Sequence, residues 1–158
     1  MSNIVVMPYE VKTFKRVEFA ETDMAGIVHF SNFFRYMEIA EADFFEKIGF
    51  PLVESTKDGF YGWPRIDAAC KFKKPAYFKD QLMIHLLIKE VRIRSIQYAF
   101  KFYRQERENR GNTLLAIGKM TTVFAQRRAD QTMVSSSLRA DFIRKLEEAP
   151  PEMIPTIK

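Results

Sequence analysis

The strongest hydrophobic pattern in the chain has the period of an α-helix and lies between residues 31 and 48. Apolar side chains recur there at helical intervals, which places them on one face: Phe33, Met37, Ala40, Phe44 and Ile48. Ser31 or Asn32 can cap the start of this helix, and the sequence Gly49-Phe50-Pro51 ends it. Phe34 and Phe45 make the apolar surface wider than a helix on a protein surface needs, so we expect other elements to wrap around it.

Most of the remaining chain alternates between apolar and polar positions, which is typical of β-strands with one buried face. Strands are expected at residues 11–19, 66–77, 82–88, 96–102 and 114–125, and the last of these is apolar on both faces. The alternation changes frame between Ile88 and Ile96, which indicates a turn or bulge around residues 92–95. The polar stretch 105–112, which contains Gly111, suits the connection of a hairpin.

These elements predict an α+β fold in which one antiparallel sheet curls around a long central helix. A final helix is expected to start near Ser137, to bury Leu138, Phe142 and Leu146, and to stop at Pro150. We expect a single domain over residues 1–158 with its core at about residues 11–148. A curled sheet leaves an edge and an apolar face, and the two-sided strand 114–125 offers a place to bury them in a dimer.

Composition supports one globular domain and excludes several other classes of protein. The chain has 158 residues, of which 47% are hydrophobic, enough to bury a core without disulfides. Its single cysteine, Cys70, cannot form an intrachain disulfide, and no leader-like apolar run precedes Tyr9, so we expect a cytoplasmic protein. No apolar run approaches the roughly 20 residues of a membrane-spanning helix, so no membrane partner is expected.

The net charge of +5, with a sequence pI near 9.3, favours a polyanionic partner. Nucleic acid and coenzyme A both have that character. The basic residues are scattered among acidic ones and form no consecutive block, zinc-knuckle spacing or recognisable helix-turn-helix. We therefore expect no nucleic-acid partner.

A lone carboxylate, Asp23, lies in a loop that contains Gly26 just before the long helix. The first backbone N–H groups of a helix have no partner within it, and the helix dipole places positive charge there. One small volume can therefore hold a base or nucleophile together with an oxyanion-binding surface, the two groups that acyl transfer needs. A purely structural alternative exists, because Thr22 and Asp23 can simply stabilise a turn before the glycine.

The segment from Val17 to Gly49 resembles the signature of the 4-hydroxybenzoyl-CoA thioesterase family, and the resemblance continues in order through nearly the whole chain. It rests on Glu18-Phe19, Asp23, Ala25-Gly26-Ile27-Val28, Asn32-Phe33, Glu38, Lys74-Pro75-Ala76, Asp80, Ile88-Lys89-Glu90, Arg92, Arg94, Ser95 and Val123-Phe124-Ala125. The resemblance implies the hotdog fold, hydrolysis of acyl-CoA or aryl-CoA thioesters, and a homodimer at minimum, with a homotetramer expected. It implies no cofactor besides the coenzyme A of the substrate.

The resemblance also implies roles for residues at the loop. Asp23 attacks the thioester carbonyl or activates a water molecule, and this choice stays open. Backbone N–H around Phe30 stabilises the oxyanion, and Gly26 lets the ligand approach closely. A related subfamily that acts on short aliphatic acyl-CoAs has histidine where this chain has Phe30, so Phe30 favours a site of the aryl-CoA type.

Residues outside the loop are candidates for substrate binding. The resemblance places Arg92 and Arg94, with Ser95 beside them, against the phosphates of coenzyme A, for which guanidinium geometry is well suited. An ordinary basic turn is the alternative explanation. Glu38 matches an acidic position of the family and is a candidate for the active site or its surroundings, although a solvated helix charge would have the same spacing.

Other side chains have weaker support. His29 and His85 lack the spacing of a metal site, and Cys70 lacks the motif of a thiol nucleophile, so we expect no metal. Six aromatic residues are expected near the site and suggest a pocket for a bulky or aromatic acyl group. They are Phe30, Phe33, Phe34, Phe60, Tyr61 and Trp63. Alternative functions are a thioesterase acting on acyl carrier protein and a non-catalytic module that binds acyl-CoA.

Overall fold

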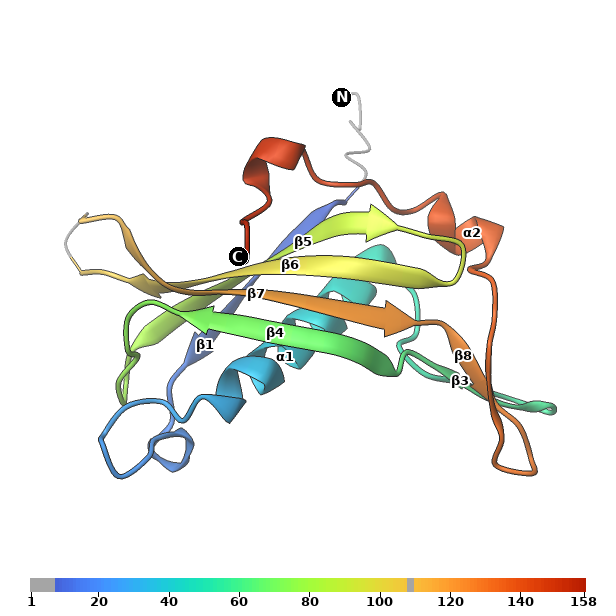
Figure 1. Cartoon of the computed structure of the whole chain (residues 1–158), viewed down its shortest axis with the longest axis horizontal. Helices are drawn as coiled ribbons and strands as arrows, with labels where there is room; N and C mark the ends of the chain where they lie inside the picture. The colour runs from blue at the N-terminus through green and yellow to red at the C-terminus, as the bar shows by residue number, and fades with distance from the viewer. Residues whose placement is uncertain (1–7, 108–109) are drawn as a thin grey trace.

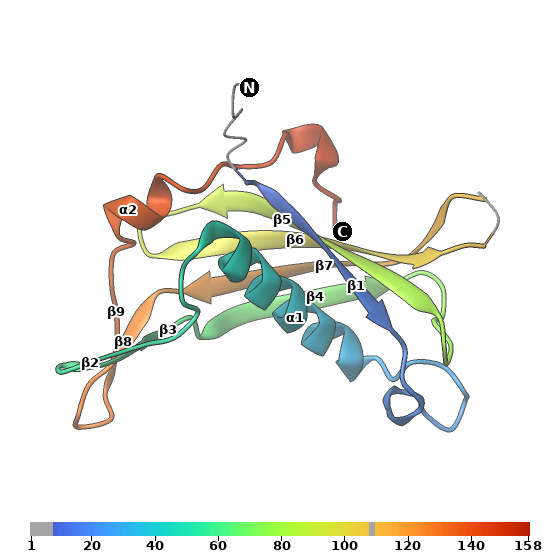
Figure 2. The same cartoon turned by 180° about the vertical axis from the view of Figure 1, so that it is seen from behind.

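The computed structural model describes residues 8–107 and 110–158. Its main feature is a five-stranded antiparallel sheet that curls around one long helix, α1 (Ser31–Ile48), as Figures 1 and 2 show. The strand order is β1-β5-β6-β7-β4, with β1 (Glu10–Arg16), β4 (Arg65–Phe72), β5 (Gln81–Val91), β6 (Ser95–Gln105) and β7 (Asn112–Val123). The predicted α+β fold and the central helix are confirmed.

Helix α1 buries the face that its sequence period predicts. Phe33, Met37, Ala40, Phe44 and Ile48 are all buried. The helix ends as expected, because Gly49 adopts the left-handed conformation, with φ 71°, that terminates helices readily. Its start differs from the expectation that Ser31 or Asn32 caps it: Phe30 occupies the N-cap, and no side-chain hydrogen bond caps the helix. The Ser31 N–H donates instead to the His29 Nδ1 at 3.3 Å, from the residue before the N-cap.

The concave face of the sheet supplies the other half of the core. Alternate residues of β5 and β6 point toward α1 and are fully buried: Leu82, Ile84, Leu86, Ile88, Ile96, Tyr98, Phe100 and Phe102. On β7 the helix approaches so closely that a Cβ at Gly118 would lie 2.3 Å from the Cε of Met37. The sheet thus closes around the middle of the helix.

The connection between β5 and β6 confirms the predicted break in register. The pairing shifts between Ile88 and Glu90, and a tight turn at residues 92–94 follows. Strands β6 and β7 form the expected hairpin, with Gln105 opposite Asn112. Residues 108–109 of that connection lie outside the described residues.

The two-sided apolar strand lies inside the sheet, so it does not offer the expected place to bury the edge in a dimer. Strand β7 is paired on both sides, with β6 and β4, so its backbone groups are already used within the sheet. The exposed edge on that side is β4, which pairs only with β7. Its Ile66 and Phe72 are 65% and 46% exposed.

A second, small sheet was not expected. It has the order β2-β3-β8-β9 and consists of β2 (Glu54–Thr56), β3 (Gly59–Gly62), β8 (Ala125–Arg127) and β9 (Met133–Ser135). Each strand has only three or four residues. Strands of three residues are too short to show an alternation, and the four-residue strand β3 begins and ends with glycine, which has no side chain.

The C-terminal segment is less helical than predicted. Helix α2 (Ala140–Ile143) has a single turn, although Leu138, Phe142 and Leu146 are buried as expected. The chain then leaves the helix and contacts the sheet, where the Ala149 N–H donates to the Ile88 carbonyl at 2.8 Å. Backbone bonding to β5 here replaces further helical turns. Two 3-10 turns, η1 (Phe19–Glu21) and η2 (Pro151–Met153), complete the described elements.

Candidate active site

Asp23 lies at the start of a tight turn between η1 and α1. The Gly26 N–H donates to the Asp23 carbonyl at 2.9 Å, and Gly26 adopts a φ of +77° that a residue with a Cβ rarely takes. The Asp23 Oδ1 accepts from the Ala25 N–H at 2.8 Å. The structural role that a turn aspartate commonly has is therefore present, and it fixes the direction of the carboxylate.

The loop is fastened to its surroundings at several points. The Val28 N–H donates to the Ala76 carbonyl at 2.8 Å, and Ile27 pairs with Tyr77 in an isolated bridge. The buried Asn32 side chain donates to the Glu21 carbonyl, also at 2.8 Å. These bonds join the loop to the start of α1 and to the connection between β4 and β5.

The start of α1 faces the same space as Asp23. Among the described residues no acceptor is found for the Phe30 N–H, while the next turns bond normally, with Phe33 N–H donating to the Phe30 carbonyl at 3.2 Å. The dipole of an 18-residue helix adds partial positive charge at this end. The Phe30 N–H is therefore available to an anion.

Asp23 and Phe30 line one cleft of about 520 Å³, a size typical of small-molecule sites. Most of the wall is apolar and comes from the loop, from α1 and from the chain that follows β4: Ile27, Val28, Phe33, Phe72, Pro75 and Ala76. Gly26 is not part of this wall. A Cβ at its position would meet nothing within 4 Å. The structure thus unites two of the three residues predicted at the loop.

Lys73 and Lys74 also line the cleft and were not singled out for chemistry from the sequence. They lie just after β4, where the Lys73 and Lys74 N–H groups donate to the Leu115 carbonyl at 2.8 and 3.0 Å. Both residues are exposed, and they add two cations to a wall that is otherwise apolar apart from Asp23. The signal available for Lys74 was the segment Lys74-Pro75-Ala76, which is part of the resemblance.

Glu38 does not line the cleft in one protomer. Its carboxylate lies 3.3 Å from the guanidinium of Arg65 on the edge strand β4 and is largely exposed. The neighbouring Glu41 is the buried carboxylate, also paired with Arg65, and burial raises its pKa to about 7 although the Arg65 charge acts in the opposite direction. Both acids therefore fasten β4 to α1.

Arg92, Arg94 and Ser95 lie at the turn between β5 and β6, far from Asp23 within one protomer. Figure 1 shows this turn and the Asp23 loop at opposite ends of the long axis. Arg92 pairs with Glu90 at 2.9 Å, and Arg94 donates to Ser135 Oγ at 3.0 Å. The turn itself is closed by the Arg92 N–H, which donates to the Ser95 carbonyl.

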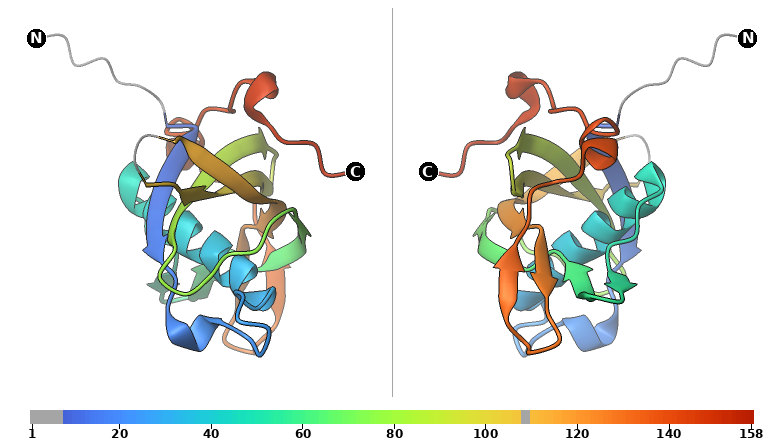
Figure 3. Two further views of the ribbon diagram at one scale, coloured as in Figure 1. Left: turned by 90° about the vertical axis from the view of Figure 1, so that its left-hand side faces the viewer. Right: turned by 90° about the vertical axis from the view of Figure 1, so that its right-hand side faces the viewer.

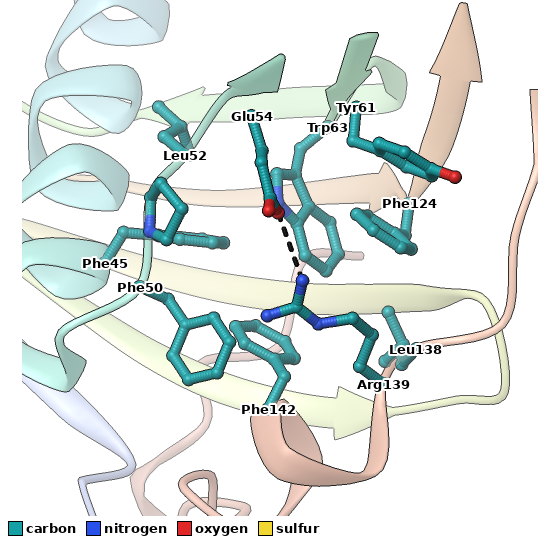
Figure 4. Close-up of a pocket in the computed structure, with 11 residues that line it drawn as sticks. Phe45, Phe50, Leu52, Glu54, Tyr61, Trp63, Phe124, Leu138, Arg139 and Phe142 are labelled. Carbon is teal, nitrogen blue, oxygen red and sulfur yellow. Dashed lines mark hydrogen bonds and ion pairs between the residues drawn. The ribbon is translucent and has the colours of Figure 1, made fainter. Parts of the chain in front are cut away.

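Tyr61 and Trp63 do not line the Asp23 cleft, so the expectation that they lie near this site is wrong. They line an aromatic pocket at the other end of α1, together with Phe45, Phe124 and Phe142 (Figure 4). The cavity has a volume of about 20 Å³, which suffices for roughly one water molecule. The pocket is therefore a packed aromatic cluster, and Arg139 and Glu54 form an ion pair of 3.1 Å across it.

The remaining reactive side chains have structural partners. His29 Nδ1 lies 2.8 Å from Ser31 Oγ, and the buried His85 pairs with Glu10 of β1. Burial raises the pKa of the Cys70 thiol to about 12, so this side chain is a poor nucleophile. Within residues 8–107 and 110–158 no cluster of three or more His, Cys, Asp or Glu side chains could hold a metal, and no helix is long and apolar enough to cross a membrane.

Known proteins are similar to this chain in sequence and in fold. The model of the thioesterase-like superfamily matches residues 17–155. The 4-hydroxybenzoyl-CoA thioesterase of Pseudomonas sp. is 36% identical over 83 residues, which cover 51% of this chain and 59% of that enzyme. A 1,4-dihydroxy-2-naphthoyl-CoA hydrolase of Prochlorococcus marinus is 33% identical over 95 residues, which cover 56% of this chain and 63% of that enzyme.

A solved structure gives the same result for the fold. The crystal structure of a 4-hydroxybenzoyl-CoA thioesterase variant in complex with 4-hydroxybenzoyl-CoA has a TM-score of 0.77 and 22% sequence identity, covering 89% of this chain and 100% of that chain. The predicted hotdog fold and the predicted family of acyl-CoA thioesterases are both confirmed. With the family match extending over residues 17–155, the chain belongs to the thioesterase-like superfamily.

Proposed function

We propose that this protein hydrolyses an acyl-CoA or aryl-CoA thioester to the free acid and coenzyme A, with Asp23 as the reactive carboxylate. The proposal rests on one observation: Asp23 and Phe30, the residue at the start of α1, line the same mostly apolar cleft. Relatives named as 4-hydroxybenzoyl-CoA thioesterase and 1,4-dihydroxy-2-naphthoyl-CoA hydrolase support the reaction class.

Two routes use this geometry equally well. As a nucleophile, the Asp23 carboxylate adds to the thioester carbonyl, the carbon–sulfur bond breaks, and water then hydrolyses the mixed anhydride. As a general base, Asp23 takes a proton from the water molecule that attacks the carbonyl, and the departing thiolate is protonated afterwards. In both routes the carbonyl oxygen becomes negative, and the Phe30 N–H and the helix dipole stabilise it.

The walls of the cleft contribute to the same reaction. Phe33 and Phe72 are in edge-to-face contact, with ring centroids 5.1 Å apart, and present aromatic surface beside Asp23. Apolar walls exclude bulk water, which strengthens hydrogen bonds to a developing oxyanion. They also favour a bulky or aromatic acyl group over a short polar one.

The experiment that tests this function measures free thiol released from a panel of CoA thioesters. We expect turnover of at least one thioester, with aromatic or bulky acyl groups preferred to acetyl. A protein that only binds acyl-CoA would give a binding signal but no thiol. The same panel presented on acyl carrier protein separates the two thioesterase alternatives, since a preference for the carrier protein would contradict the proposed CoA substrate.

We also propose that two copies pair through β4 and complete the site. Strand β4 is an exposed edge with unpaired backbone groups, and such edges in native proteins are covered, charged or paired. Its last residue, Phe72, lines the Asp23 cleft, so a second copy seated on β4 would lie against the cleft. Assembly of two such dimers into a tetramer and a cytoplasmic location remain predictions.

The proposed binding of coenzyme A phosphates by Arg92 and Arg94 requires this second copy. The turn between β5 and β6 that carries them lies at the opposite end of the protomer from the loop before α1 (Figure 2), so they would reach the substrate from a partner subunit. Replacing both with Glu should raise the KM for acyl-CoA more than it lowers kcat. An acyl thioester of N-acetylcysteamine has no phosphate and should be cleaved equally well by variant and wild type.

Three further residues are proposed to support substrate binding less directly: Ser95 next to Arg94, Glu38 on α1 and Gly26 in the Asp23 loop. Ser95 holds the turn through its carbonyl, and Glu38 lies with Arg65 at the exposed edge. In the dimer proposed above, Glu38 would face the partner subunit rather than its own cleft. Gly26 is proposed to keep the loop open to the ligand, since the space beside it is empty of protein atoms.

A further inference from the structure

A second cleft lies at the same end of the molecule as Asp23. The connection between β4 and β5 separates the two: Pro75 and Ala76 line the Asp23 cleft, and Tyr77 and Lys79 line the second. The left panel of Figure 3 looks onto this end. The second cleft has a volume of about 720 Å³, well within the range of ligand sites, and we call it the basic cleft.

The basic cleft has an excess of positive charge. Five basic and two acidic side chains line it, so basic side chains outnumber acidic ones by three. The net charge of the whole chain is +5. Both acids are used by one residue: Arg104 Nε donates to Glu106 at 3.0 Å, and Arg104 Nη1 lies 3.6 Å from Asp80. Among the described residues, no ion pair involves the other four basic side chains, which are Arg16, Lys79, Arg107 and Arg110.

The wall of the basic cleft is held in place. The Val17 N–H donates to the Asp80 carbonyl at 2.9 Å, and the Lys79 N–H donates back to the Val17 carbonyl at 3.1 Å. The Asp80 carboxylate accepts from the Tyr77 N–H at 2.9 Å. Lys79 has a φ of +69°, a conformation that is unfavourable for a residue with a Cβ and that this bonding maintains.

An exposed aromatic ring completes the set of groups. Tyr77 is 47% exposed and lines the basic cleft beside Lys79. Aromatic rings provide stacking surfaces for nucleobases, whereas Arg and Lys side chains bind phosphate oxygens. A ligand with only a carboxylate or only one phosphate would leave several of these charges unpaired.

We propose that the basic cleft binds a nucleotide with two or more phosphate groups, its base against Tyr77 and its phosphates between Arg16 and Lys79. Two sources supply this chemistry: the nucleotide end of the acyl-CoA substrate, and a separate nucleotide that acts as an effector. The first source rests on the proposed thioesterase function and would place the coenzyme beside Asp23 of the same protomer, in contrast to the Arg92 and Arg94 site.

Direct binding tests the proposal without reference to catalysis. Calorimetry with adenosine 3′,5′-bisphosphate, ADP and adenosine should show saturable binding of the two phosphorylated probes and none of adenosine. The double variant Arg16→Glu/Lys79→Glu should weaken binding at least about tenfold, because it reverses two screened attractions. Arg104 is left unchanged, since its ion pairs hold the cleft together.

A matched variant controls for net charge. Lys57 and Arg128 are exposed and line neither cleft, so Lys57→Glu/Arg128→Glu makes the same change in charge elsewhere. It should bind the probes as wild type does. Equal losses in both double variants, or no binding to wild type, would overturn the proposal. The thermal unfolding midpoint of each variant shows whether it is folded.

Kinetics then distinguish the two sources. If the nucleotide belongs to the substrate, Arg16→Glu/Lys79→Glu raises the KM for acyl-CoA and leaves the hydrolysis of the N-acetylcysteamine thioester unchanged. In that case ADP also competes with acyl-CoA in the wild type. If it is a separate effector, the variant hydrolyses acyl-CoA normally, and added nucleotide changes the rate of wild type only. A protein without thioesterase activity would fail both kinetic tests, yet the binding result would still decide the existence of the site.

Discussion

At the scale of single residues, Asp23 combines a structural contact with a proposed chemical one. Its Oδ1 accepts from the Ala25 N–H, and the same carboxylate lines the cleft beside Phe30. Because asparagine keeps an oxygen in that position, Asp23→Asn should leave the turn and the unfolding midpoint almost unchanged. It should lose at least about a hundredfold in kcat/KM, since the negative charge is removed.

The control for this variant is Asp23→Ala, which loses both the turn contact and the charge. It should be inactive and also somewhat less stable, so comparing the two variants separates structure from chemistry. The measurement is thiol release under single-turnover conditions, with the unfolding midpoint measured in parallel. An Asp23→Asn protein with near wild-type turnover would contradict the proposed mechanism.

Glu41 gives a prediction for pH at the same scale. Burial raises the pKa of this carboxyl from 4.5 to about 7, against the opposing charge of Arg65. A pKa that is higher in the folded state means that the stabilisation is fully present below pH 4.5 and is lost as the pH rises toward 7. Glu41→Gln should remove this dependence, so the difference in unfolding free energy should change by up to about 1.4 kcal/mol per pH unit.

Urea unfolding of both proteins between pH 5 and pH 8 measures that difference. His85 acts in the opposite direction, because burial lowers its pKa and its contribution to stability is lost as the pH falls. Both proteins keep His85, so its contribution cancels when the two curves are subtracted. Parallel curves would show that Glu41 does not titrate in this range.

At the scale of secondary structure, the sequence predicts best those elements that bury one face over many residues. Helix α1 and strands β5 and β6 each contact the core on one side for 18, 11 and 11 residues, which leaves a clear period. The small sheet has strands too short for a period, and the final helix is limited to one turn by backbone bonding of Ala149 to β5.

The site could be predicted only in part, for a related reason. Asp23 and Phe30 are seven positions apart and share a cleft because both lie just before the start of one helix. Phe72, Lys73 and the basic cleft come from segments that only the tertiary fold brings to this end. No local pattern in the sequence reports that proximity.

Strand β7 offers a test at this scale, because Ile117 is buried with a lysine opposite it on each side. The register pairs Ile117 with Lys71 of β4 and with Lys101 of β6. Replacing Ile117 with a charged residue of either sign loses about 1.5–3 kcal/mol of the stabilisation that apolar burial provides. Like charges on adjacent strands add a further penalty, whereas opposite charges offset part of the loss.

We therefore expect Ile117→Lys to be less stable than Ile117→Glu by about 1 kcal/mol or more. Chemical denaturation at low ionic strength measures both variants against wild type. Raising the salt concentration should reduce the gap, because the difference is electrostatic. Equal stability of the two variants would show that Lys71 and Lys101 turn away from Ile117.

At the scale of the whole molecule, the unpaired edge β4 predicts a dimer. Ile66, 65% exposed on this edge, would be covered by a second copy. Ile66→Lys should raise the dimer dissociation constant at least about tenfold, because it places a charge in an apolar contact. Val53, 51% exposed outside the sheet edge, provides the control variant Val53→Lys, which should dimerise normally.

Sedimentation velocity over a range of concentrations measures both variants. Thiol release at the same concentrations should fall together with the dimer fraction, because the partner is proposed to complete the site. A wild-type protein that is monomeric and fully active at micromolar concentration would contradict this prediction. Dimers that persist in Ile66→Lys would show that another surface holds the copies together.

The separation of Asp23 from Arg92 and Arg94 leads to the last prediction, a test by mixed subunits. If one substrate contacts Asp23 of one copy and Arg92 and Arg94 of the other, the two kinds of defect complement each other. A mixture of Asp23→Asn chains and Arg92→Glu/Arg94→Glu chains, after exchange, contains mixed dimers in half of the population. Each mixed dimer has one intact site, so about a quarter of wild-type activity should return in a symmetric dimer.

The assay uses acyl-CoA well below its wild-type KM, where the arginine variant alone is weakest. Each variant mixed with itself controls for the effect of exchange. An equal mixture of wild type with a chain that contains all three substitutions gives a second test. About a quarter of the activity should remain if each site spans two chains, and about half if each site lies within one chain. Absence of any recovered activity would mean that the coenzyme phosphates bind within one protomer, and the basic cleft beside Asp23 would then be the place to look for them.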